Sequence, residues 1–281
     1  MFRINGTPVR IERYPDGTLR LVIDEIPEEF NAERLYEYGK DEIADEITIE
    51  WIYENDEEMT LFFIARHLRE RYAYRDIALY MPYIPYARMD RVYDEDEVFT
   101  LKYFCDLINV LGFSKVTVRD AHSPVSLGML NNVTEEPVDG VINELIDELL
   151  DREKDIVFYP DNGSRNRYSG MIDFPHAYGV KERDRITGTI MRHEVRGDIP
   201  AAPFNVLIID DISSYGGTFL HSATKLKELG ADKIYLYVTH CENSILKGEL
   251  INSGLIEKIY TTRSIYTGDH PLIEVIDGDE I

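Results

Sequence analysis

The sequence predicts an α/β protein made of two similar domains, each with a mostly parallel sheet flanked by helices. Three observations carry this prediction. A buried strand leads directly into a helix near residue 210, further strands and helices alternate along the chain, and one helix–strand pattern is repeated.

Residues 206–210 form an uninterrupted apolar run that ends in an acid, which is typical of a buried parallel strand. Residues 219–229 follow with apolar side chains at helical spacing. The two aspartates, Asp210 and Asp211, stand at the carboxyl end of the strand, where open α/β sheets bind ligands. Two glycines before a helix allow close approach of a ligand, and the N–H groups of that helix favour a phosphate. An ordinary strand–helix turn with two solvated acids is the alternative.

The repeat relates residues 111–122 to residues 229–240 at a constant offset of 118 residues. Each copy contains Leu-Gly, a lysine and a final histidine, so we expect a helix end, a glycine cap and a strand ending at histidine. The chain is therefore expected to form a domain over 1–140 and another over 141–281.

The remaining elements follow from local patterns. Asn55 precedes several acids and an apolar pattern over 59–68, which predicts a capped helix. A charged centre at 181–185 predicts an exposed loop. Hairpin strands are expected at 8–12 and 19–23, further strands at 77–82, 116–118 and 155–159, and further helices at 100–111 and 143–150.

Composition limits the function. The net charge of −23 disfavours nucleic acid and anionic membranes as partners, so an anionic ligand needs a local positive patch. Residues 165–196 supply one, with seven basic and four acidic side chains. There is no membrane-length apolar run and no apolar core of a signal peptide, and the two cysteines are expected in the core. We therefore expect a cytoplasmic protein.

Residues 210–218 resemble the ribose-phosphate loop of the phosphoribosyltransferase fold, in which two acids bind ribose hydroxyls and the turn surrounds a 5′-phosphate. Further segments, Asn55-Asp56, 82–91, 120–123 and 160–163, occur in the order found in ribose-phosphate pyrophosphokinases, also called phosphoribosyl pyrophosphate synthetases. The resemblance implies two phosphoribosyltransferase-type domains. It also implies transfer of pyrophosphate from Mg–ATP to the anomeric hydroxyl of ribose 5-phosphate.

The resemblance implies that the first domain binds ATP and that the enzyme uses Mg²⁺. The positions that match ATP-binding residues are Arg88, Asp90, Arg91, Tyr14 and Asp16. The last two match residues that reach the adenine of a neighbouring subunit, which implies a homo-oligomer with the ATP site near a subunit interface. The Mg²⁺ ligands are implied to be His122 and Asp161.

The resemblance places catalysis and sugar binding in the second domain. Lys181 and Arg183 match a basic loop whose cations stabilise charge on the transferred group. The ribose-phosphate-binding positions are Asp210, Asp211, Ser213, Ser214, Tyr215, Gly216, Gly217 and Thr218.

Four positions depart from the family pattern: Thr18, Met89, Glu182 and Tyr215. Because Tyr215 replaces a small residue, a 5′-extended ribose such as ADP-ribose is an alternative acceptor. A phosphoribosyltransferase and a catalytically silent regulatory subunit are two further alternatives. We expect catalysis, because the residues matched to the reaction are otherwise retained.

Overall fold

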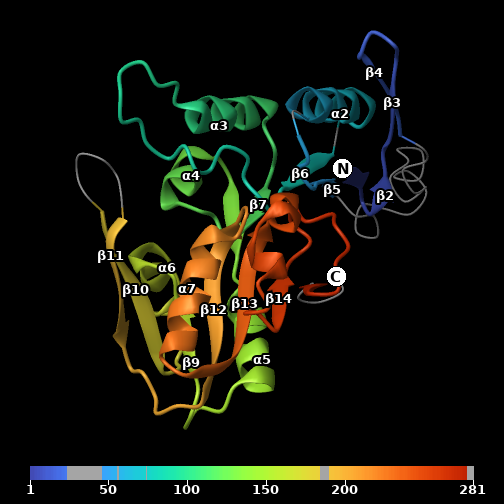
Figure 1. Cartoon of the computed structure of the whole chain (residues 1–281). Coiled ribbons are helices and arrows are strands. Elements are labelled where there is room, and N and C mark those ends of the chain that lie inside the picture. Colours follow the sequence, from blue (N-terminus) through green and yellow to red (C-terminus); the bar gives the residue numbers. More distant parts are fainter. Residues whose placement is uncertain (24–45, 56, 74, 184–189, 277–281) are drawn as a thin grey trace. The chain divides into compact units, whose positions relative to one another are not determined.

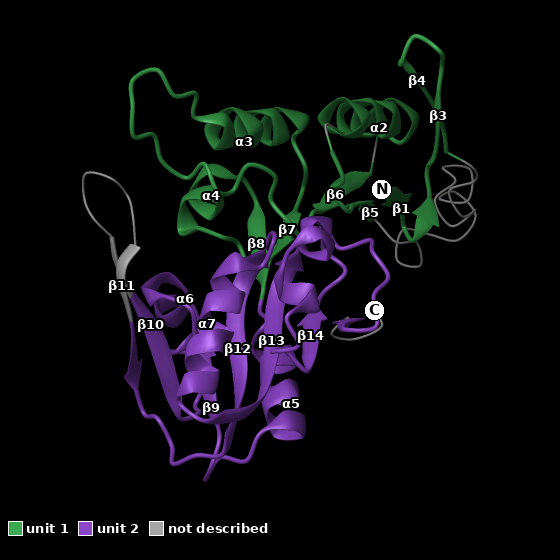
Figure 2. Ribbon diagram, in the orientation of Figure 1, with its two compact units in different colours: residues 1–136 green, residues 137–281 purple. Residues whose placement is uncertain are grey.

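The computed structural model describes residues 1–23, 46–55, 57–73, 75–183 and 190–276, and only the backbone of 181–183 and 190–193. The chain divides into two compact units, residues 1–136 and 137–281 (Figure 2). Each is described separately below. No helix among these residues is long and apolar enough to span a membrane.

In the described part of unit 1, six strands form a sheet in the order β2-β1-β5-β6-β7-β8 (Figure 1). The strands are β1 (Phe2–Ile4), β2 (Thr7–Pro8), β5 (Glu46–Trp51), β6 (Asp76–Tyr80), β7 (Val116–Arg119) and β8 (Val133–Glu136). The last four are mutually parallel, and β1 is antiparallel to both of its neighbours. The helices described in unit 1 are α2 (Glu58–Arg71), α3 (Thr100–Leu111) and α4 (Pro124–Met129). A separate hairpin is formed by β3 (Arg10–Arg13) and β4 (Leu19–Val22), as predicted.

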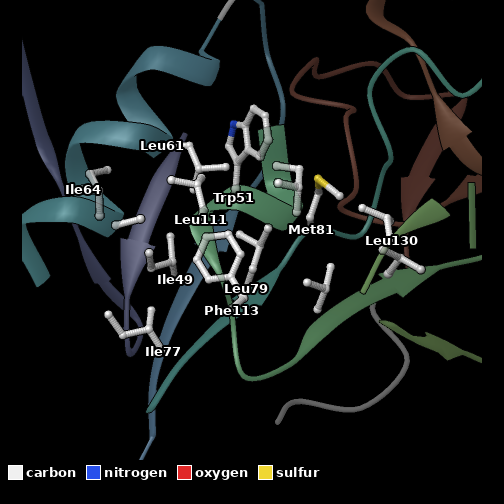
Figure 3. Packing of buried hydrophobic residues seen from close by; sticks show 14 of the residues in the cluster. Ile49, Trp51, Leu61, Ile64, Ile77, Leu79, Met81, Leu111, Phe113 and Leu130 are labelled. Atoms are coloured by element: carbon white, nitrogen blue, oxygen red, sulfur yellow. The ribbon is translucent and has the colours of Figure 1, made fainter. Parts of the chain in front are cut away.

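The core of unit 1 forms where the sheet meets helices α2 and α3 (Figure 3). Ile49 and Trp51 alternate with more exposed residues along β5. They pack with Leu61 and Ile64 of α2 because these recur on one helix face. Asn55 is not the N-cap of α2, which corrects the prediction. Glu57 occupies that position without a capping hydrogen bond.

The seven strands described in unit 2 have the order β11-β10-β9-β12-β13-β14-β15. They are β9 (Ile156–Tyr159), β10 (His176–Arg183), β11 (Ile190–Gly197), β12 (Phe204–Ser213), β13 (Ala231–Cys241), β14 (Lys258–Thr261) and β15 (Ile273–Val275). Only the β10–β11 pair in this described sheet is antiparallel. The helices are α5 (Asp139–Leu149), α6 (Asn162–Tyr168) and α7 (Gly217–Glu228), followed by short 3₁₀ segments η3 (Asn243–Lys247) and η4 (Leu250–Asn252).

Strand β12 separates two halves of the unit 2 core. Val206 and Ile208 pack in one cluster with Phe219, Ala223 and Leu226 of α7. Leu207 and Ile209 pack in another cluster with residues of α5 and α6. Because successive strand residues point to opposite faces, α7 covers one face of the sheet and α5 and α6 cover the other.

The charged stretch predicted as a loop begins as a strand. Lys181 to Arg183 continue β10 and pair with β11, with Lys181 opposite His193. Backbone pairing between antiparallel strands does not depend on apolar side chains, so the charges did not end the strand there. The rest of the predicted loop, residues 184–185, lies outside the described residues.

Candidate active site

The carboxyl end of β12 places its two aspartates in different surroundings. Asp210 and Asp211 are successive residues at the end of the strand, and their carboxyl groups are close enough to interact with each other. Asp211 is buried on the α6 side, with Oδ2 3.6 Å from Nη2 of Arg167. Oδ1 of Asp210 accepts a 3.0 Å hydrogen bond from the backbone N–H of Asp211. The predicted pair of sugar-binding acids is therefore not symmetrical.

A third carboxylate lies near this pair. Asp161 follows β9, which is hydrogen-bonded in parallel to β12. Burial, followed by repulsion from Asp211 and Asp161, raises the pKa of Asp210 well above its ordinary value. The fold thus brings Asp161 close to Asp210 and Asp211 at the carboxyl end of the strands, although 49 residues separate Asp161 from Asp210 in the sequence.

Asp161 also begins helix α6. Its Oδ1 accepts hydrogen bonds from the backbone N–H groups of Gly163, at 2.9 Å, and Ser164, at 3.2 Å. The hydroxyl of Ser164 then donates to the carbonyl of Ile209 at 2.7 Å, which attaches α6 to β12. No cluster of three or more His, Cys, Asp or Glu able to hold a metal ion occurs among the described residues.

The turn between β12 and α7 requires glycine at its last position. Gly216 is the N-cap of α7 and has φ of 80°, in the left-handed region. A Cβ there would also lie 2.8 Å from Cδ2 of Leu250. The N–H of Glu242 donates to the carbonyl of Ser213 at 2.8 Å, so the segment from Glu242 to Leu250 supports the turn from one side.

The side chains of the turn differ in their accessibility. Ser213 is 1% exposed, and its hydroxyl donates to the carbonyl of Ser214 at 3.3 Å. Tyr215 is 60% exposed. Gly217 and Thr218, the first residues of α7, are exposed. The accessible polar groups of the turn are thus mainly on its helical side.

In unit 1, Asp90 interacts with residues of two predicted segments, 82–91 and 120–123. Arg91 donates to it through Nε, at 2.8 Å, and Nη2, at 3.0 Å. This bidentate bond, then a hydrogen bond from Ser123 and the nearby charge of His122, lower the pKa of Asp90. Two hydrogen bonds to Asp90 therefore hold the guanidinium of Arg91 in a defined orientation. Met89 is partly buried and packs against the core, which accounts for an apolar residue at this departure from the family pattern.

The two histidines of the repeat have different environments. The glycines before them, Gly112 and Gly230, both have positive φ, as the predicted caps require. His122 lies in a loop, because β7 ends at Arg119 and the next residue adopts φ of 43°. His240 lies within β13, is buried, and its Nδ1 is 2.8 Å from the hydroxyl of Ser264. The prediction that both strands end at histidine was therefore wrong in this detail.

The hairpin tip of unit 1 presents the two residues expected to reach a neighbouring subunit. Tyr14 is exposed, and Asp16 is exposed beside it. Oδ1 of Asp16 accepts the N–H of Thr18 at 3.0 Å and its hydroxyl at 2.7 Å, and these bonds lower the pKa of Asp16. Thr18 therefore has a structural function at the turn.

The remaining predicted positions, and two residues that were not predicted, differ in how far the structure describes them. Arg88 is exposed in the same loop as Arg91. The backbone of Lys181 and Arg183 lies in β10, but their side chains, and Asp56 entirely, lie outside the described residues. Sequence reasoning missed Arg167 and Gly248, because neither belongs to a recognisable motif and their contacts are to distant residues.

No family model matches the sequence. It is 30% identical over 224 residues to the ribose-phosphate pyrophosphokinase of Hyphomonas neptunium, which covers 78% of this chain and 70% of that protein. It is 27% identical over 237 residues to the ribose-phosphate pyrophosphokinase of Pyrococcus abyssi, covering 83% of this chain and 75% of that protein.

Among solved structures, the crystal structure of phosphoribosylpyrophosphate synthetase from Mycobacterium smegmatis matches with a TM-score of 0.72. The match covers 96% of this chain and 85% of that chain at 18% identity. It confirms the expected fold class of two phosphoribosyltransferase-type domains with mostly parallel sheets.

Proposed function

The chain belongs to the ribose-phosphate pyrophosphokinase family and is an enzyme of that type, and from this premise we propose its reaction. It transfers the pyrophosphoryl group of Mg–ATP to the anomeric hydroxyl of ribose 5-phosphate. The hydroxyl oxygen forms a bond to the β-phosphorus, the bond from that phosphorus to the α-phosphate oxygen breaks, and the products are phosphoribosyl pyrophosphate and AMP.

The turn at the end of β12 carries this proposal. It combines Asp210, which is partly exposed, and the buried Asp211, whose carboxylates can accept hydrogen bonds from sugar hydroxyls, with a glycine in the left-handed conformation at the N-terminus of α7. Asp210 and Asp211 bind the ribose diol in this proposal. The backbone N–H groups of Gly216 and Gly217 meet the 5′-phosphate, together with Ser214, Thr218 and the neighbouring residues of the turn.

Unit 1 is proposed to bind ATP. The guanidinium of Arg91, which Asp90 holds by two hydrogen bonds, has further N–H groups that suit polyphosphate oxygens. Arg88 contributes from the same loop. Tyr14 and Asp16 reach the adenine of a neighbouring subunit in this proposal, so the enzyme is a homo-oligomer. Its proposed location is the cytoplasm.

A magnesium ion suits the residues at the carboxyl end of β9. Asp161 offers carboxylate oxygen, and beside it burial and then the charges of Asp211 and Asp161 raise the pKa of Asp210. Asp161 would be a protein ligand of the ion, and the family resemblance implies His122 of unit 1 as a second ligand. When bound, the ion neutralises charge on the transferred phosphates. Lys181 and Arg183 supply further positive charge in the transition state, which is their proposed catalytic role.

A 5′-extended ribose such as ADP-ribose is a second candidate acceptor. The exposed ring of Tyr215 can stack on a base, and the buried hydroxyl of Ser213 leaves the turn with one donor fewer for a terminal phosphate. A diester carries less charge than a terminal monoester, so the missing donor costs it less. We rank ribose 5-phosphate first, because Tyr215 is exposed and Gly217 and Thr218, at the start of α7, are exposed beside it.

The deciding experiment incubates the pure protein with Mg–ATP and either sugar and follows AMP release. Rapid release with ribose 5-phosphate and none with ADP-ribose supports the first acceptor, and the reverse result supports the second. ATP binding without AMP release from either sugar would instead identify a regulatory subunit. Consumption of phosphoribosyl pyrophosphate in the presence of a free base would identify a phosphoribosyltransferase.

A further inference from the structure

Arg167 and Asp211 form an ion pair that is largely shielded from water. Nη2 of Arg167 lies 3.6 Å from Oδ2 of Asp211, and the two side chains are 21% and 7% exposed. The pair between Arg152 and Asp173 in the same unit provides a contrast, with side chains that are 57% and 98% exposed. Water and salt screen the exposed pair far more than the shielded one, so the charge of Arg167 acts more strongly on its partner.

The fold brings Arg167 to this position through helix α6. Asp161 caps the start of the helix, and the hydroxyl of Ser164 donates to the carbonyl of Ile209, two residues before Asp211. Arg167 is three residues after Ser164 and therefore lies on the same face of α6. The helix is attached to β12 at the point from which Arg167 reaches the acid.

Two further acids lie near this ion pair. Asp210 is the neighbour of Asp211 in the chain, and the carboxylate of Asp161 is close enough to act on Asp210. Arg167 places a positive charge against Asp211 at this crowded end of the strand. At 3.6 Å the contact is an ion pair and not a close hydrogen bond, so charge matters more here than the shape of the guanidinium.

We infer that Arg167 is a positioning residue, which holds the carboxylate of Asp211 in place through their ion pair so that it accepts hydrogen bonds from the ribose hydroxyls. The inference rests on the proposed sugar site. It assigns to Arg167 part of the selectivity for a sugar with an intact diol, because an acid that has lost its charge or its place binds hydroxyls less well than a fixed carboxylate.

The test measures binding of ribose 5-phosphate and 2-deoxyribose 5-phosphate by calorimetry, without ATP. Arg167→Met is expected to weaken binding of ribose 5-phosphate by roughly ten- to a hundredfold and to change binding of the deoxy sugar much less. Arg167→Lys retains the charge and is expected to restore most of the preference for the intact diol. Arg152→Met, which removes an arginine from an exposed ion pair, is the matched control and is expected to bind like the unaltered chain.

A double-mutant cycle separates positioning from a contribution to folding. Asp211→Asn removes the charge on which Arg167 acts, so adding Arg167→Met should weaken sugar binding no further. The double variant also leaves no uncompensated buried charge, so its folding is less affected than that of the single Arg167 variant and its binding can be measured even where the single variant is destabilised. Additive losses, or an unchanged preference between the two sugars in Arg167→Met, would overturn the inference.

Turnover is measured separately from binding. Absence of AMP release by the unaltered chain, with diol-selective binding retained, counts against the proposed reaction and leaves the role of Arg167 supported. If the unaltered chain binds neither sugar, both proposals are overturned.

Discussion

Replacing Gly248 by alanine should disturb the sugar-phosphate turn without changing the identity of any predicted site residue. Gly248 follows η3 with φ of −83°, which any residue adopts, so the substitution adds no backbone strain of its own. The new Cβ, however, would lie 2.8 Å from the carbonyl carbon of Tyr215, and closer still to its oxygen. The effect of the substitution is therefore steric and is directed at the turn.

The displacement can be worked out from these distances. Ordinary van der Waals contact begins at 3.4 Å, so relieving the contact with the carbonyl carbon alone requires a movement of 0.6 Å (3.4 − 2.8), and the closer contact with the oxygen requires more. Backbone atoms cannot rotate away as a flexible side chain can. Because misplacing a binding group by about 1 Å can cost a hundredfold in rate, we expect Gly248→Ala to lower kcat/KM with ribose 5-phosphate roughly tenfold. Overpacking should also lower the free energy of unfolding by about 1–3 kcal/mol.

The assay compares AMP release over a range of ribose 5-phosphate concentrations, with urea unfolding as the measure of stability. Gly140→Ala is the matched control, because no atom lies within 4 Å of a Cβ at that position of α5. Alanine there should leave kcat/KM unchanged and stabilise the helix by up to about 1 kcal/mol. A Gly248 variant with unaltered kcat/KM and unaltered stability would refute the proposed support of the turn.

Three further predictions concern single side chains. Lys181→Ala should lower kcat by roughly two to four powers of ten with little change in KM for the sugar, and a kcat within a few-fold of the unaltered enzyme would contradict its catalytic role. Asp210→Asn should raise the free energy of unfolding at neutral pH in metal-free buffer. The folded state binds the proton of Asp210 more tightly than the unfolded state, so its contribution to stability falls as pH rises above the ordinary carboxyl pKa of 3.8. Measured by urea unfolding, the free energy of unfolding of Asp210→Asn should exceed that of the unaltered chain at neutral pH, and the difference should disappear below pH 3.8. Equal free energies of unfolding at neutral pH would show that the pKa of Asp210 is not raised. Thr18→Ala removes the 2.7 Å hydroxyl bond to Asp16 and should raise the pKa of that carboxyl, measured by NMR titration, whereas Thr18→Ser should not.

Local patterns in the sequence determined the element types and the fold class. The apolar run at 206–210 and the helical spacing after it predicted β12 and α7, and the helix predicted at 100–111 has the bounds of α3. These predictions succeeded because the periods of strands and helices report local backbone geometry and burial. The start of α2 was predicted too early in the chain, because asparagine is a preferred N-cap residue and Asn55 precedes the helix. The N-cap is Glu57, whose carboxylate accepts a hydrogen bond from the indole N–H of Trp51.

The tertiary structure alone decided which of these residues meet. The sequence indicated that Asp210 and Asp211 stand at a strand end, but only the packing of α6 against β12 gave Asp211 its arginine partner. Asp161 approaches Asp210 because β9 and β12 are neighbours in the sheet, and Gly248 supports Tyr215 although 33 residues separate them in the chain. Sequence periodicity predicts which face of its own helix or strand a side chain occupies. Strand order and helix packing determine which other residues that side chain contacts.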